Sequence, residues 1–169
     1  MAHWLLRLLK HRRLDEADAE RLLGDGALTR IEARVAASEL HHSGEIRVCI
    51  EAGLPLSYIR REAPVRERAV MMFGKLRVWD TMYNNGVLIY LLLAEHAIEI
   101  VADRGAALHV DAAHWQRITA TMSAAFKAGQ FEAGLNQAVD AVDALLAQHF
   151  ALAPGESNPN ELPDAPYLR

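Results

Sequence analysis

Six residues with oxygen-bearing side chains stand near the ends of the apolar segments of this chain. They are Glu45, Asp80, Asn84, Asn85, Asp103 and Asp111. Carboxylate and amide oxygens are the ligands that hard cations such as calcium, magnesium and manganese prefer in proteins. Clustered carboxylates also repel one another, and a bound cation relieves that repulsion. If the fold gathers these side chains, the sequence predicts a divalent-cation site.

Each of these residues also has a local reason to stand where it does. Aspartate caps helices, and asparagine tolerates the backbone angles of tight turns. On this alternative Asp111 is only a helix cap, and Asn84 and Asn85 only form a turn. Asp80 and Asp103 would then be solvated acids in loops. Because the six residues follow no fixed-spacing motif, both interpretations stay open at this point.

The elements that would position them centre on the run Val-Leu-Ile-Tyr-Leu-Leu-Leu at 87–93. It is apolar at every position, which predicts a central strand covered on both faces. The segment 45–51 alternates between apolar and polar residues and predicts a half-buried strand, and 97–102 predicts a third. A helical region separates the first two strands, so we expect them to be parallel with a right-handed crossover. The third follows too closely for a crossover and should be antiparallel.

These strand directions bring the candidate residues to one end of the sheet. Glu45 begins the first strand, Asn85 precedes the second and Asp103 follows the third. The loops that hold Asp80, Asn84 and Asp111 are expected to meet there too. The predicted fold is an α/β/α sandwich with a small mixed central sheet flanked by helices.

The remaining segments divide the chain into three parts. Residues 1–26 form an N-terminal helical extension, 27–150 the α/β domain and 151–169 an extended tail that docks through Leu162 and Tyr167. Within the domain, Thr29 is expected to cap a helix that ends near His41 and His42, which we interpret as a solvated terminus. Asp111 is expected to cap a later helix.

Composition excludes several classes of function. The net charge is −4, and basic residues are not interleaved with aromatic ones, so nothing favours nucleic-acid binding. Cys49 is the only cysteine, which excludes an intramolecular disulfide and zinc sites built on several cysteines. It lies within a predicted strand and is interpreted as packing. No Gly-x-Ser-x-Gly motif is present, so whether the protein is an enzyme stays open.

The first thirteen residues, 1–13, are apolar and basic, with Arg7 and Lys10 interrupting the leucines. They match neither a signal peptide nor a membrane span. One interpretation is a short amphipathic helix that makes weak contact with a membrane surface or a partner. The other, which we favour, is a helix whose leucines dock on the domain.

Several stretches together resemble the TPM domain family, over about residues 29–150. The matching stretches include Ser43-Gly44-Glu45-Ile46-Arg47-Val48, Asn85-Gly86-Val87-Leu88, Ile98-Glu99-Ile100-Val101-Ala102-Asp103-Arg104-Gly105, Asp111-Ala112 and Gly134-Leu135. The tail at 158–164 is similar to a short bacterial branch without secretion signal or membrane anchor. The family pattern has aspartate where Asn84 stands. That change replaces a charge with a neutral oxygen and should weaken cation binding.

The resemblance implies an α/β/α sandwich, and its members include calcium binders, acidic phosphatases and proteins of membrane-complex repair or receptor assembly. Bacterial members are often encoded beside a LemA-type membrane protein and a membrane-anchored TPM paralogue, which are the implied partners. We therefore expect a cytoplasmic, membrane-peripheral interaction domain that binds Ca²⁺, or Mg²⁺ or Mn²⁺. The alternative is a metal-assisted phosphatase acting on phosphate esters, with Arg104 beside the reacting phosphate. A purely structural adaptor is the third hypothesis.

Overall fold

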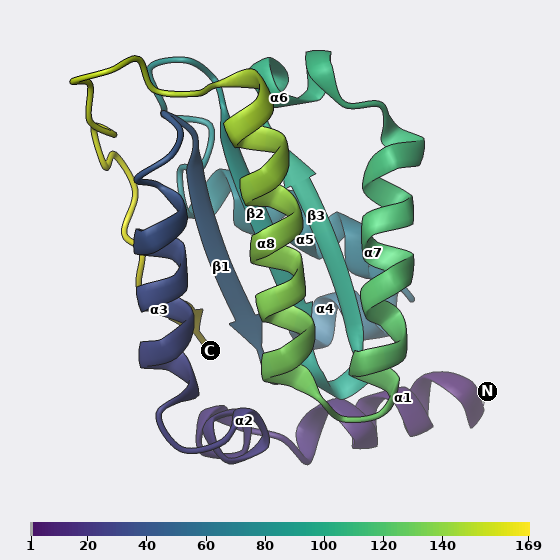
Figure 1. Cartoon of the computed structure of the whole chain (residues 1–169). Helices are drawn as coiled ribbons and strands as arrows, with labels where there is room; N and C mark the ends of the chain where they lie inside the picture. The colour runs from purple at the N-terminus through teal and green to yellow at the C-terminus, as the bar shows by residue number, and fades with distance from the viewer. Residues whose placement is uncertain (1) are drawn as a thin grey trace.

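The computed structural model describes the backbone of residues 2–169 and the side chains of 4–111, 113–120 and 122–169 (Figure 1). Its helices are α1 Ala2–Arg12, α2 Glu16–Leu23, α3 Ala27–Ser38, α4 Leu56–Arg60, α5 Val65–Lys75, α6 Arg104–His109, α7 Ala112–Lys127 and α8 Phe131–His149. Its strands are β1 Glu45–Glu51, β2 Gly86–Leu92, β3 Ala97–Ala102 and β4 Tyr167–Leu168, and a 3₁₀ turn η1 spans Leu93–Glu95.

The strands form one mixed sheet in the order β3-β2-β1-β4. β1 and β2 are parallel, with Glu45 opposite Gly86, and β2 and β3 are antiparallel, with Val87 opposite Ala102. The predicted directions of all three strands are therefore confirmed. The two-residue strand β4, which lies in the tail and pairs with β1 in parallel, was not predicted.

Helices cover both faces of the sheet, which confirms the α/β sandwich. Figure 1 shows α7 and α8 in front of the sheet, and α4 and α5 behind it. The apolar residues on the front face, such as Ile46, Val87 and Ile89, pack against α3, α7 and α8 in the larger core. On the rear face, Leu88 and Tyr90 pack with Met72 of α5 and Leu162 of the tail in the smaller core.

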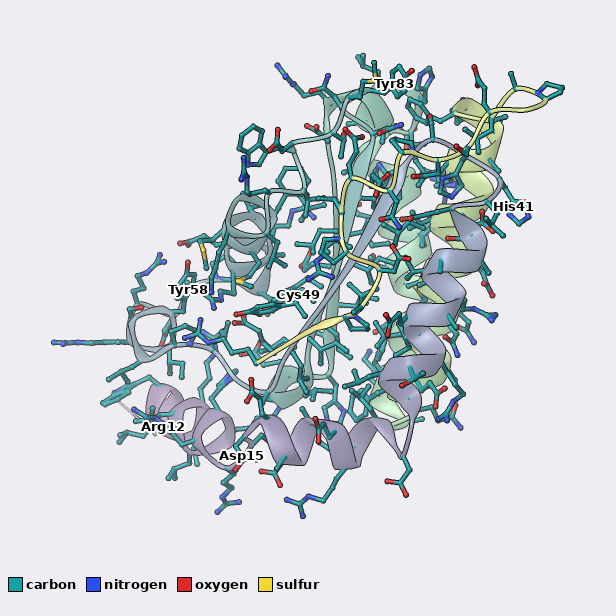
Figure 2. The ribbon with its side chains drawn as sticks, turned by 90° about the vertical axis from the view of Figure 1, so that its left-hand side faces the viewer. Arg12, Asp15, His41, Cys49, Tyr58 and Tyr83 are labelled. Carbon is teal, nitrogen blue, oxygen red and sulfur yellow. The ribbon has the colours of Figure 1, made fainter. Side chains whose placement is uncertain are left out.

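β1 is buried at all seven positions, so the prediction of a half-buried strand is wrong. Its polar side chains are buried with partners rather than facing water. Arg47 donates to the carbonyl oxygens of Pro163 and Ala165 in the tail, and Glu51 pairs with Arg68 of α5. Figure 2 shows the tail passing over this face of β1 near Cys49. The alternation in the sequence correctly predicted polar residues on the second face of β1. It did not show that the tail and α5 cover this face.

The ends of α3 also differ from expectation. The helix begins at Ala27 after Gly26, whose backbone is left-handed, so Thr29 lies inside it and is not its cap. At the other end His42 is completely buried, whereas a solvated terminus was predicted. Its Nδ1 lies 3.0 Å from the Gly44 carbonyl oxygen, and its Nε2 lies 3.4 Å from Asp143 Oδ1 of α8. Burial lowers the pKa of His42.

The N-terminal helix α1 is held to the domain mainly by polar contacts. Arg7 Nε and His11 Nε2 lie 2.6 Å and 2.9 Å from Glu95 Oε1, and His11 Nδ1 accepts a hydrogen bond from Leu54 N. The His11 and Arg7 hydrogen bonds lower the pKa of Glu95 to about 2.

Of the leucines of α1, Leu8 packs against the smaller core. Three others are exposed: Leu5, Leu6 and Leu9. The docking interpretation therefore holds for one side of the helix only. Among the described residues, no helix is long and apolar enough to cross a membrane.

Candidate functional site

Three of the six candidate residues, Asn84, Asn85 and Asp103, lie on the two segments that meet where β2 begins and β3 ends. The Asp103 N–H donates to the Gly86 carbonyl oxygen at 2.9 Å, which places Asp103 next to the start of β2. The Gly105 N–H donates to the Asn84 carbonyl oxygen at 2.7 Å, and Arg104 Nη2 lies 3.2 Å from Asn84 Oδ1. The turn at 84–86 and the exit of β3 at 103–105 therefore form one contiguous surface.

Two glycines allow this close packing of loops. A Cβ atom on Gly86 would lie 2.0 Å from the Val78 carbonyl oxygen, which no side chain tolerates. A Cβ atom on Gly105 would lie 2.5 Å from the Tyr83 carbonyl oxygen and 2.6 Å from that of Asn84. Figure 2 shows Tyr83 at this end of the molecule, opposite the end where Arg12 and Asp15 lie. The missing side chains let the carbonyl oxygens of Val78, Tyr83 and Asn84 come close to Gly86 and Gly105.

Asn85 and Asp103 each have a buried side-chain oxygen that the described residues leave without a hydrogen bond. Asn85 is fully buried, and its Nδ2 donates to the Ser43 carbonyl oxygen at 3.1 Å, but its Oδ1 has no partner. Asp103 is 7% exposed; its Oδ1 accepts from Arg104 N, and its Oδ2 has no partner. A buried acceptor without a donor costs about 1–3 kcal/mol. Native proteins keep such groups mainly where a ligand, ion or water satisfies them.

Glu45 stands opposite Gly86 in the sheet register, but its carboxylate belongs to a different cluster. Its Oε2 accepts from Leu162 N in the tail at 3.0 Å, and Oε1 has no partner among the described residues. Burial, opposed by hydrogen bonds from the tail backbone, raises the pKa of Glu45, and Glu161 and Asp164 raise it further. The structure therefore places this carboxylate against the tail.

Glu39, at the end of α3, is the residue of this second cluster that sequence reasoning missed. It is 4% exposed, and its Oε1 accepts from Ile46 N at 2.8 Å. Burial, with contributions from Glu45 and Asp164, raises the pKa of Glu39 to about 8. A carboxyl with that pKa is largely protonated at neutral pH. The only sequence signal was a glutamate at the end of a helix where solvent was expected.

The last two candidates have local partners. Asp80 is exposed, and its Oδ2 lies 2.7 Å from Arg77 Nη2. Asp111 caps α7 by accepting from His114 N at 2.6 Å, as predicted, and it also lines a groove beside β3. Within the described part of the chain, no three His, Cys, Asp or Glu side chains come together as a metal-binding group. Any cation at the sheet end would therefore be held largely by amide and carbonyl oxygens around Asp103.

The cysteine of the chain does not belong to this arrangement. Cys49 is fully buried in β1, and burial raises the pKa of its thiol far above the usual range. A thiol in that state is a poor nucleophile. Its interpretation as a packing residue agrees with its place in the smaller core.

Comparison with known protein families gives one match, to the TPM domain, over residues 17–145. The chain belongs to the TPM domain family. The match begins within α2 and ends within α8, so it includes the sheet end with Asn84, Asn85 and Asp103. No curated protein matches the chain.

Solved structures show the same fold. The NMR structure of the BA42 protein from the psychrophilic bacterium Bizionia argentinensis superposes with a TM-score of 0.71 at 27% identity, covering 83% of this chain and 91% of that one. The N-terminal domain of a protein from P. gingivalis superposes with a TM-score of 0.62 at 20% identity, covering 78% and 83%. At 20% identity, the similarity to the P. gingivalis domain shows a shared fold and nothing more. This TPM domain therefore shares its architecture with proteins from two further bacteria.

Proposed function

We propose that this TPM domain binds a divalent cation at the sheet end formed by Asn84, Asn85 and Asp103. The observation that carries the proposal is Asp103 Oδ2, a buried carboxylate oxygen that has no hydrogen-bond partner among the described residues and lies beside the start of β2. Asn85 Oδ1, on the residue before Gly86, is a second buried oxygen without such a partner. A cation satisfies such acceptors without needing a donor. Calcium suits the site best, because it accepts amide and carbonyl oxygens in flexible geometry. With a single carboxylate, the dissociation constant is expected to be on the order of 10⁻⁴–10⁻³ M.

The cation serves an interaction domain in this proposal, and the partner is membrane-associated. A LemA-type membrane protein or an anchored TPM paralogue is the partner class that the family resemblance implies. The exposed side of α1 supports membrane proximity, because Leu6 is 66% and Leu9 55% exposed beside basic residues. Apolar and basic residues on one short helix favour the surface of an anionic membrane, although a single such helix binds weakly.

Calcium is expected to raise the melting temperature of the protein, and Asp103→Asn should abolish that effect. Asparagine keeps the helix cap of α6 but removes the one negative charge at the site. At a calcium concentration 100 times the dissociation constant, binding contributes about 2.7 kcal/mol, or a rise of about 5–10 °C for a domain of this size. Differential scanning calorimetry with and without calcium measures this rise.

Asp140→Asn is the matched control for that experiment. Asp140 is an exposed aspartate of α8 paired with Arg34, so its replacement changes the net charge equally without touching the sheet end. The calcium-dependent rise should survive in this variant. A rise that persists in Asp103→Asn, or disappears in both variants, would place the cation elsewhere.

A metal-assisted phosphatase is the second candidate, favoured by the position of Arg104. Its guanidinium lies 3.2 Å from Asn84 Oδ1, where it could contact the phosphate of a substrate held by the cation. Hydrolysis of a generic phosphate ester by the purified protein should then fall by about 10²-fold or more in Arg104→Met. Arg117→Met, which removes an exposed arginine of α7, is the control. Equal activity in both variants would exclude the phosphatase.

Membrane contact through α1 gives a separate expected result. Replacing both Leu6 and Leu9 by glutamate should reduce binding to vesicles that contain anionic lipid, because it removes apolar area and adds repulsion. Leu40→Glu is the control, since Leu40 is 75% exposed but lies outside α1. Vesicle co-sedimentation measures the bound fraction. Equal binding of the wild type and the α1 double variant would remove this helix from the proposal.

A further inference from the structure

The tail at 158–169 lies on the body of the domain in the way that an extended peptide lies on its binding surface. At its start, Asn158 Nδ2 donates to the carbonyl oxygens of His42 and Gly44 at 2.9 Å and 3.1 Å. Toward its end, the two residues of β4 extend the sheet by pairing with β1 in parallel. Figure 2 shows the tail crossing β1 between these points. Adding a strand to the edge of a sheet is a common mode of peptide recognition.

The middle of the tail is held by one apolar side chain and by backbone groups. Leu162 is 6% exposed and packs in the smaller core, and its N–H donates to Glu45 Oε2 at 3.0 Å. Arg47 donates to the carbonyl oxygens of Pro163 and Ala165. The body therefore presents a surface fitted to this segment, with an apolar contact, an arginine that binds two carbonyl oxygens and the edge of β1.

This contact also contains a repulsion, because Asp164 of the tail carries the same charge as Glu39 and Glu45 of the body beside it. Glu161 of the tail adds further negative charge next to Glu45. Glu45 Oε1 and Asp164 Oδ1 are buried without a hydrogen-bond partner among the described residues. Arg47 also interacts with Asp164, but its guanidinium is engaged by carbonyl oxygens of the tail. Carboxyl groups crowded in this way repel one another, which eases detachment of the tail.

The segment at 153–157, which leads from α8 to this part of the tail, is exposed at every position. It forms a local turn, in which Ala153 N donates to Glu156 Oε2 and Glu156 N donates to the Ala153 carbonyl oxygen. Gly155 has a φ of 89°, a backbone conformation that glycine adopts readily. Figure 1 shows the chain looping outward here after it leaves the top of α8. Straightening this turn would carry the tail away from its own domain without disturbing a buried side chain of the turn.

We propose that the tail exchanges between two copies of this chain, so that each copy seats its residues 158–169 on β1 of the other. A second copy fits this surface because it carries the same segment that the surface already holds, and every contact of the closed form is regained in the exchanged pair. The turn at 153–157 is the hinge of the exchange. A tail on a short flexible tether competes at an effective concentration on the order of 1 mM, so the exchanged pair forms at comparable protein concentrations. The exchange does not depend on the cation site.

Paramagnetic labelling of mixed copies tests the exchange directly. One copy is the isotope-labelled wild type, whose amides are observed. The other is unlabelled and carries a nitroxide at Arg169→Cys, an exposed position whose backbone bonds to Ile50 and Ala52, with Cys49→Ala so that it has a single thiol. A matched control copy carries the nitroxide at Arg117→Cys, an exposed position of α7, which packs beside β3 at the opposite edge of the sheet.

At a protein concentration of about 1 mM, the Ile50 and Ala52 amides of the wild type are expected to lose roughly a third of their intensity to the tail label. The Arg117 label should leave these two amides unchanged. Adding Leu162→Ala to the copy with the tail nitroxide should abolish the loss, because that tail lacks its apolar anchor and competes poorly with the wild-type tail.

Unchanged Ile50 and Ala52 intensities, equal losses from the two label positions, or a loss that survives Leu162→Ala overturns the proposal. Self-association in a sedimentation experiment without this loss would assign the dimer to another surface of the chain, and would likewise overturn the exchange.

Discussion

Arg68→Met is expected to lower the free energy of unfolding by about 3–5 kcal/mol, the usual cost of removing one partner of a buried ion pair. Arg68 is 3% exposed and Glu51 only 1%. Arg68 Nε donates to Glu51 Oε2 at 2.7 Å, Nη2 donates to Oε1, and Tyr90 Oη donates to Oε2 at 2.7 Å. Without the guanidinium, Glu51 keeps a single donor in the core and must either hold an unpaired charge or take up a proton.

Urea unfolding at neutral pH measures this effect against an exposed pair of the same type. Arg61 also pairs with a glutamate through two nitrogens, but its side chain is 51% exposed. Arg61→Met should therefore cost no more than about 1 kcal/mol. Adding Glu51→Gln to Arg68→Met should restore part of the stability, because it removes the buried charge. Equal losses in the two arginine variants would mean that the buried network does not stabilise the sheet.

This network also engages the carboxylate that ends β1, at the carboxyl end of the parallel strands. Open α/β sheets commonly bind ligands beyond the carboxyl ends of their parallel strands. Here the carboxylate of Glu51, the last residue of β1, is already hydrogen-bonded to Arg68 and Tyr90. The available oxygens lie at the opposite end, beside Gly86.

Stability is expected to fall as the pH rises from about 5 to about 8, and Glu39→Gln should flatten that fall. The folded protein raises the pKa of Glu39 from its ordinary value of 4.5 to about 8 through burial and the neighbouring Glu45 and Asp164. Because the folded state holds a proton that the unfolded state releases, this contribution is fully present below pH 4.5 and is lost as the pH rises through 8. Its size is on the order of 3 kcal/mol.

Urea unfolding at three pH values between 5 and 8 checks the slope. Glutamine mimics the protonated carboxyl, because its amide can accept from Ile46 N and donate toward Asp164. Glu132→Gln is the control, since Glu132 pairs with Arg30, which lowers its pKa and keeps it ionised throughout this range. The Glu39 variant should lose most of the slope and the control should keep it. If the stability of Glu39→Gln falls with pH as steeply as that of the wild type, Glu39 is not the group that titrates.

The tail is the part of the chain that this titration should loosen first. Leu162 N donates to Glu45 Oε2, and Arg47 holds the carbonyl oxygens of Pro163 and Ala165. When Glu39 loses its proton, its negative charge beside Glu45 and Asp164 weakens these contacts by repulsion. Hydrogen exchange of the Leu162 amide should therefore quicken with pH beyond the intrinsic rate.

The strands and their directions could be predicted from the sequence because the signals are local. The uninterrupted apolar run of β2 required cover on both faces, and the lengths of its two connections decided the parallel and antiparallel pairs. Those directions put the start of β2 and the end of β3 at the same end of the sheet, as predicted. The cap of α7 at Asp111 is equally local, since it needs only the first turn of its own helix.

What the sequence could not supply depends on distant segments. The burial of Glu39 and His42 arises from their packing against β1 and α8, and the environment of Glu45 from a tail more than a hundred residues away. β4 is only two residues long and has no periodicity to detect. The same tail changed β1 from a half-buried strand into a fully buried one.

A calcium titration of the metal-free protein, followed through backbone and side-chain amide resonances, tests the central claim most directly. We predict saturable shifts centred on Asn85, Gly86, Asp103 and Gly105, with weaker ones for magnesium, which tolerates irregular oxygen sites poorly. The same titration of Asp103→Asn should show none of them. Shifts confined to Glu39, Glu45 and Asp164, or no saturable shift at millimolar calcium, would contradict a cation site at the start of β2.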